Sequence, residues 1–206
     1  MSQPYDLSGL AALDVTLNQM LGDQASGATG FAGSEQSWIA SPTGWFKAIL
    51  TSGGSPSPTN ADAVRTSFKS VRTIFDLLAG GTGSAAALAV QASTPPSLLL
   101  ETGRSPTGPQ TAYGPVMNAA SFVASTSYDL SGIANLQTTA NAMLADALSG
   151  ATVFTGWGEA WKPSPKGQFQ AILVPNGAAQ AATIGTVLDR MNLLQKKLGQ
   201  LGTDRR

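Results

Sequence analysis

The sequence predicts a mainly α-helical protein built from two similar small helical bundles, and three observations lead to this fold class. Residues 5–50 recur, without a gap, as residues 128–173. Within each copy, apolar residues return every three or four positions, which is the spacing of one helix face. Between the copies lies a stretch dense in proline and glycine, which disfavours a long helix. We therefore predict a helical unit over residues 1–80, an extended connector arm over 81–127 and a second helical unit over 128–206.

The repeat is too close to arise by chance. With an offset of 123 positions Tyr5 aligns with Tyr128, and 26 of the 46 aligned residues are identical. Unrelated chains of ordinary composition would share about three. Beyond Leu50 an offset of 120 aligns the apolar positions, for example Val64 with Ile184. The sequence thus predicts an internal duplication in which the second copy has lost three loop residues.

The first helix of each unit is predicted from a leucine-rich stripe with spacings of three and four. Its members are Leu7, Leu10, Leu13, Leu17, Met20 and Leu21 in the first copy, and Leu130, Ile133, Leu136, Ala140, Met143 and Leu144 in the second. Either Asp6 and Asp129 or Ser8 and Ser131 are suited to cap the start of these helices, because their side-chain oxygens can accept from free amides.

A short second helix is predicted in each unit. Serine followed by proline is typical of a helix start, and this pair occurs at residues 41–42 and again at 164–165. The helix would carry Phe46 and Ile49 in the first copy, with Phe169 at the equivalent place in the second.

The third helix is predicted to start near Asn60 or Thr183. It has the clearest apolar stripe of the chain. The stripe consists of Val64, Phe68, Val71, Ile74, Phe75 and Leu78, matched by Ile184, Leu188, Met191, Leu194, Leu198 and Leu201. Each unit should therefore be a small helical bundle, and the two units can share one core through a pseudo-twofold axis.

Composition excludes several classes of function. The chain has no cysteine and no histidine, so thiolate chemistry, the serine–histidine triad and the usual zinc sites are absent. Charged residues make up only 12%, and the formal net charge is zero. Such a surface does not attract nucleic acid or an anionic membrane, and it favours packing against neighbouring subunits. No cofactor, metal ion or small-molecule substrate is expected.

The candidate site residues are apolar groups suited to contacts with other proteins. Trp45 and Trp157 have no aromatic counterpart in the other copy, and tryptophan is enriched at interfaces. The connector carries further apolar side chains that a fully solvated linker would not need. The predicted interface residues are Trp45, Trp157, Leu98, Leu99, Leu100, Tyr113 and Met117.

The acidic residues are the remaining candidates for chemistry. Asp23 is equivalent to Asp146, so a carboxylate pair across a twofold axis could share a proton or a metal ion. Both aspartates fall at a predicted helix end, and neither has a partner in the sequence. Structural roles are therefore favoured, and we predict no catalytic residue.

In general character the chain resembles a virion component of a tailed bacteriophage. It is rich in alanine, glycine, serine and threonine, it lacks cysteine, and it combines helical units with an irregular arm. The resemblance implies a structural subunit in the connector, tail or fibre-attachment region, or on the capsid, with itself and other structural proteins as partners. The start of the chain lacks a signal peptide and no segment has 18 consecutive apolar residues, so a virion or otherwise cytoplasmic location is expected.

Two other functions remain open at this stage. A non-enzymatic adaptor could bind two similar targets with its two units and gain from multivalency. An enzyme using only carboxylates, such as a glycoside hydrolase, would need an acid and nucleophile pair from the 12 acidic residues.

Overall fold

The computed structural model describes residues 4–25, 45–80, 127–148 and 167–203. Within these ranges the protein is mainly helical, as predicted, and it also contains two small sheets. Half 1 (residues 4–80) and half 2 (residues 127–203) have the same order of elements. Half 1 contains β1 (Tyr5–Asp6), α1 (Gly9–Ala25), β2 (Trp45–Ile49), β3 (Ser57–Asn60) and α2 (Ala61–Gly80); half 2 contains β4 (Tyr128–Asp129), α4 (Gly132–Leu148), β5 (Gln168–Ile172), β6 (Gln180–Thr183) and α5 (Ile184–Gln200).

The two halves exchange their first strands. β1 of half 1 pairs in parallel with β5 of half 2, which in turn pairs antiparallel with β6. In the same way, β4 of half 2 pairs with β2 of half 1, beside β3. The ladders continue for one more residue, because the amide of Leu7 donates to the carbonyl of Ile172 (2.8 Å) and that of Leu130 to Ile49 (2.9 Å). Neither three-stranded sheet is therefore complete within one half.

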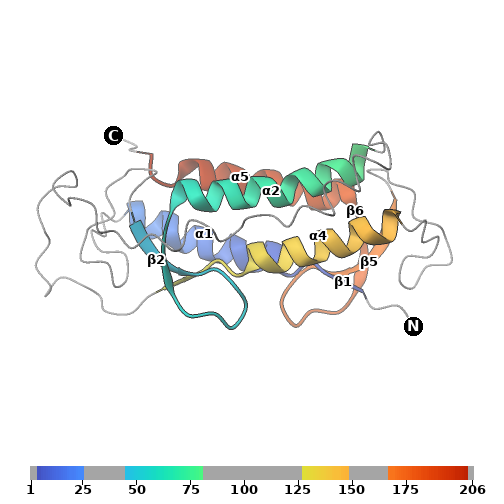
Figure 1. The fold of residues 1–206 in the computed structure, drawn as a ribbon, viewed down its shortest axis with the longest axis horizontal. Helices are drawn as coiled ribbons and strands as arrows, with labels where there is room; N and C mark the ends of the chain where they lie inside the picture. The colour runs from blue at the N-terminus through green and yellow to red at the C-terminus, as the bar shows by residue number, and fades with distance from the viewer. Residues whose placement is uncertain (1–3, 26–44, 81–126, 149–166, 204–206) are drawn as a thin grey trace, which may run out of the picture.

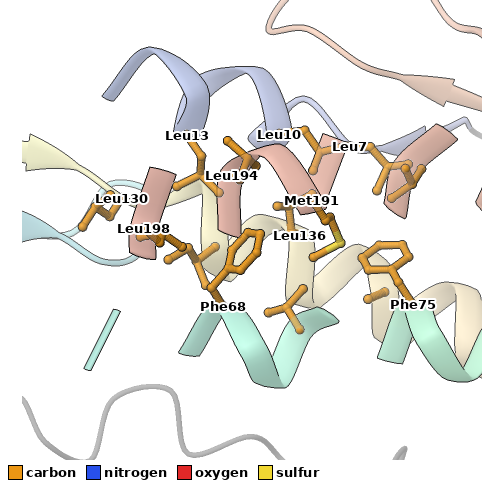
Figure 2. Packing of buried hydrophobic residues seen from close by; sticks show 14 of the residues in the cluster. Leu7, Leu10, Leu13, Phe68, Phe75, Leu130, Leu136, Met191, Leu194 and Leu198 are labelled. Atoms are coloured by element: carbon orange, nitrogen blue, oxygen red, sulfur yellow. The ribbon is translucent and has the colours of Figure 1, made fainter. Parts of the chain in front are cut away.

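The helices form the body between the two sheets. In Figure 1, α2 and α5 lie side by side in opposite directions, while α1 and α4 run from the middle of the molecule toward opposite ends. Figure 2 shows buried side chains from all four helices meeting in the interior, among them Leu10, Phe68, Leu136 and Met191. The buried residues of both halves belong to one hydrophobic cluster. The two halves thus share a single core.

The predicted short second helix is wrong where the structure describes it. Residues 45–49 form strand β2 and residues 168–172 form strand β5. Phe46 and Ala48 are buried, whereas Lys47 and Ile49 are less so, which is the alternation of a strand. Phe46 and Ile49 are three positions apart, a spacing that also fits a helix, and the exchanged strand supplies backbone partners that the sequence does not reveal. The two serine–proline pairs lie outside the described residues.

The predicted loss of three residues in the second copy is also wrong. Asn60 pairs with the first residue of β2 and precedes α2, and Thr183 pairs with the first residue of β5 and precedes α5. These two positions differ by 123, so the original offset holds through the hairpin and into the last helix. An apolar helix stripe repeats at intervals of three and four, so a shift of three moves each residue onto the next apolar position. The stripe alone could not fix the alignment.

Side-chain caps mark the starts of α2 and α5, and aspartates shape the turns that lead into α1 and α4. Asn60 Oδ1 accepts from the amide of Ala63 (2.8 Å), and Thr183 forms a reciprocal capping box with Thr186. Ahead of α1, Asp6 Oδ1 accepts from the amide of Ser8 (2.9 Å), and Asp129 makes the same bond to Ser131 (3.0 Å). The third helix therefore starts as predicted, and the two aspartates fold the chain at the strand-to-helix turn.

Candidate functional site

The most distinctive polar arrangement in the described residues holds the exchanged strands. The arrangement occurs twice, and the copy where β1 meets half 2 is called the first exchange site. Tyr5 lies edge-on to Phe169, with ring centroids 5.9 Å apart and planes at 78°. Its hydroxyl donates to Asp146 on α4. The backbone carbonyl of Asp6 accepts from Thr139 Oγ1 at 2.6 Å. Groups of half 2 thus anchor the strand of half 1 through its ring, its hydroxyl and its backbone.

The second exchange site repeats this arrangement where β4 meets half 1. Tyr128 lies edge-on to Phe46, with centroids 6.0 Å apart and planes at 83°. Its hydroxyl donates to Asp23 on α1 at 2.5 Å. The carbonyl of Asp129 accepts from Thr16 Oγ1 at 2.8 Å. Each contact of the first site has its counterpart at an offset of 123.

The two tyrosines act as hydrogen-bond donors. Burial, together with the hydrogen bond and the negative charge of Asp146, raises the pKa of Tyr5 far above its usual value. Burial and Asp23 raise the pKa of Tyr128 in the same way. Because the phenolate is disfavoured, each hydroxyl keeps its proton at physiological pH and does not serve as a base or nucleophile. The exchange sites are therefore suited to holding the halves together.

We expect Tyr5→Phe and Tyr128→Phe each to lower the free energy of unfolding by about 1–2 kcal/mol, because each loses a bond to a carboxylate while keeping its ring contact. The sites are at opposite ends of the molecule, so the double variant should lose about the sum. Urea denaturation followed by circular dichroism measures these changes. Asp146→Asn retains an acceptor and should cost less than Tyr5→Phe; a single Tyr→Phe variant as stable as the parent would contradict the structural role.

Equivalent residues of the two halves meet at the middle of the molecule, which marks a pseudo-twofold axis. A Cβ built on Gly9 would lie 2.6 Å from the carbonyl oxygen of Gly132, and one built on Gly132 would lie 2.8 Å from that of Gly9. Between α2 and α5, Arg72 Nη1 donates to Gln195 Oε1 at 2.6 Å. Gly9 with Gly132, and Arg72 with Gln195, both differ by 123. Arg72 therefore reaches across from α2 to the other half.

The two halves differ beside this axis. Lys197 on α5 forms an ion pair with Asp14 on α1, with Nζ and Oδ1 2.5 Å apart. The equivalent positions hold Ile74 and Gln137, and both of these are buried. Among the described residues, Oε1 of Gln137 finds no hydrogen-bond partner, although the side chain is only 6% exposed. One side of the molecule therefore has an ion pair where the other has an unsatisfied acceptor.

We expect Gln137→Met to raise the free energy of unfolding by about 1–2 kcal/mol, because it removes a buried acceptor without changing the side-chain length. Differential scanning calorimetry measures the change. Gln19→Met is the matched control, since Gln19 is exposed on the equivalent helix α1; it should leave stability within about 0.5 kcal/mol. Loss of stability in Gln137→Met, with the control unchanged, would show that the amide has a partner in solution.

The predicted interface residues fall almost entirely outside the described ranges. Trp45 is the first residue of β2. Trp157, Leu98, Leu99, Leu100, Tyr113 and Met117 lie in residues that the structure does not describe. The structure therefore does not bring this set together as a site, and the set stays a prediction.

Asp23 and Asp146 are the functional residues whose partners the sequence did not reveal. Each aspartate bonds a tyrosine of the other half, and they do not form a pair with each other. The one sequence feature that pointed to these contacts is that both copies have a tyrosine and an aspartate at equivalent positions. That signal becomes interpretable only once the strand exchange is known.

Three features of the described residues bear on metal binding, membrane insertion and docking. Nowhere in the described ranges do three carboxylates lie close enough to hold a metal ion. Among the same residues, no helix has the length and apolar character needed to cross a membrane. The large exposed apolar side chains there are Val15, Val174 and Leu193. Val15 lies on α1, Leu193 on α5 and Val174 in the turn after β5. Isolated apolar groups of this kind are normal on a protein surface.

Comparison with protein-family models, with curated proteins and with solved structures finds no match to this chain.

Proposed function

We propose that this chain is a non-enzymatic structural subunit of a symmetric assembly, in the connector, tail or fibre-attachment region of a tailed bacteriophage virion. The observation that carries the proposal is that two halves of similar sequence form one body with equivalent sheets at its two ends. The sheets and the helices that carry them are therefore present in two pseudo-equivalent versions. A ring of n such chains offers 2n similar contact regions, so a single chain type can join rings of different order.

The similarity of the halves supports an origin by internal duplication. The identical residues include those that matter for joining the halves, such as Tyr5 and Tyr128 or Asp23 and Asp146. A duplicated subunit keeps such residues because both copies need the same contact. Residues 81–127 are proposed as the arm that reaches other subunits, since their apolar groups require cover.

The low charge of the chain is consistent with this role. With 12 basic and 12 acidic residues among 206, neighbouring subunits experience little net repulsion. In the described residues, the buried hydroxyls of Thr16 and Thr139 each donate to a backbone carbonyl of the other half. The proposed partners are further copies of the chain and other structural proteins of the assembly.

The proposal is tested by the mass of the purified chain and by its location. Light scattering over a concentration series should give a defined oligomer, and mass spectrometry should detect the chain in purified virus particles. A strict monomer that is absent from particles would overturn the proposal.

A second candidate is a bivalent adaptor. The pseudo-equivalent sheets at opposite ends favour it, because a surface built on one sheet recurs on the other. Such a module would be a monomer that binds two copies of one target, which isothermal titration calorimetry detects as a stoichiometry of two.

A further inference from the structure

We propose that each half of this protein is an incomplete folding unit whose partner is the other half, and that a second copy of this chain can supply that partner. The inference concerns the fold alone. It holds or fails independently of the proposed role in a virion.

Each half lacks an element that only the other half supplies. The β2–β3 hairpin of half 1 receives β4, and the β5–β6 hairpin of half 2 receives β1. Tyr5 donates to Asp146 and Tyr128 donates to Asp23, so the tyrosine hydroxyl of each exchanged strand bonds to the other half. The core is likewise one cluster from both halves. Separation would expose apolar surface and leave buried polar groups without partners.

The contacts along α2 and α5 add to this dependence. Arg65 on α2 donates through Nε to the carbonyl of Leu198 (2.9 Å) and also bonds the carbonyl of Leu201, near the end of α5. Gln24 on α1 donates to the carbonyl of Gln200 (3.1 Å) and accepts from the amide of Gly202 (3.0 Å). Half 1 thus satisfies the carbonyl groups that a helix end leaves free.

The differences between the halves favour unlike pairs over pairs of half 1. Two copies of half 1 would place Arg72 opposite Arg72 on the axis, where the chain has Arg72 opposite Gln195. Like charges at this distance repel. The same pair would place Asp14 against Ile74 in place of Lys197. Half 1 should therefore select half 2 as its partner.

The positions of the chain ends explain how a second copy could take part. The end of α2 and strand β4 lie at opposite ends of the body, because β4 pairs with β2 at the end of the molecule where α2 begins (Figure 1). The 20 residues of α2 cover about 30 Å. A link between these points needs at least about nine extended residues. The native connector exceeds this length, so the halves pair within one chain at ordinary concentration.

The first experiment cuts the covalent link between the halves in the folded full-length protein. A recognition sequence for a site-specific protease is inserted after Arg104, within the connector, and the folded protein is cleaved. We expect native mass spectrometry to show a one-to-one complex of the two pieces, with an unchanged helical circular dichroism signal. Pieces that come apart on cleavage while each keeps its helicity, or pieces that lose helicity at once, would overturn the proposal.

Exchange between copies is measured on the same cleaved protein. Light and isotopically heavy cleaved samples are mixed, denatured and refolded. We expect complexes that combine a light half 1 with a heavy half 2, and no complex of two half 1 pieces. A matched variant, Gln195→Arg, places two arginines on the axis. Its cleaved complex should dissociate into separate halves at a higher total protein concentration than the parent complex does. Equal dissociation of the two proteins, or complexes of like halves at statistical frequency, would contradict the selection of unlike halves.

The second experiment forces the exchange in an uncut chain. Residues 81–126 are replaced by a four-residue link, which is too short to join Gly80 to Ser127 within one body. We expect a closed dimer of twice the chain mass with native helicity, each body formed by half 1 of one chain and half 2 of the other. A folded monomer of this variant would overturn the proposal, and the cleavage experiment decides the matter if the variant does not fold.

Discussion

Gly9→Ala should lower the free energy of unfolding by about 1–3 kcal/mol, although alanine is the better helix former. The added Cβ would lie 2.6 Å from the carbonyl oxygen of Gly132 and 3.0 Å from Cγ of Leu136. The nearer atom belongs to the backbone of α4, so it cannot turn away as a flexible side chain could. α1 and α4 must move apart, which loosens the core that they share. Thermal unfolding followed by circular dichroism measures the loss.

Gly22→Ala is the matched control in the same helix. A Cβ at Gly22 would meet no atom of the described part of the chain within 4 Å. The control should therefore gain about 0.5–1 kcal/mol from helix propensity alone. The double variant Gly9→Ala with Gly132→Ala should lose less than the sum of its single losses, because the first substitution already separates the helices. Strictly additive losses, or a gain in Gly9→Ala like that of Gly22→Ala, would show that the helices do not meet at these glycines.

Much of the helical structure was predictable from the sequence because apolar periodicity extends over many residues. The stripe from Leu10 to Met20 is buried as predicted, and α2 and α5 begin directly after Asn60 and Thr183. In such segments the local pattern and the final packing require the same residues to be buried. The mainly helical fold class therefore follows from composition and spacing.

The strands and their exchange were not predictable in the same way. β2 has five residues and β1 has two, which is too short for alternation to be distinguished from helical spacing. The chain segments that start at Tyr5 and at Tyr128 are also identical over five residues, which include strands β1 and β4. Local sequence cannot specify whether such a strand joins its own hairpin or that of the other half. The choice depends on tertiary contacts such as those of Asp23 and Asp146.

The shared core leads to the second large effect. We expect Leu194→Ala to lower the free energy of unfolding by about 2–5 kcal/mol, because it leaves a cavity at a side chain that is only 1% exposed. Figure 2 shows Leu194 among buried side chains of both halves, including Leu13 and Phe68. Hydrogen exchange measured by mass spectrometry should therefore show faster global exchange in α2 of half 1 as well as in α5.

Leu193→Ala is the control, since it makes the same substitution one position away at a side chain that is 61% exposed. It should change stability by less than about 0.5 kcal/mol and leave exchange in both halves unaltered. If Leu194→Ala accelerated exchange in half 2 alone, the two halves would have to unfold separately, each with a core of its own. Equal acceleration in both halves is the outcome expected when strands, helix ends and core are all completed across the pseudo-twofold axis, because no half can then open without the other.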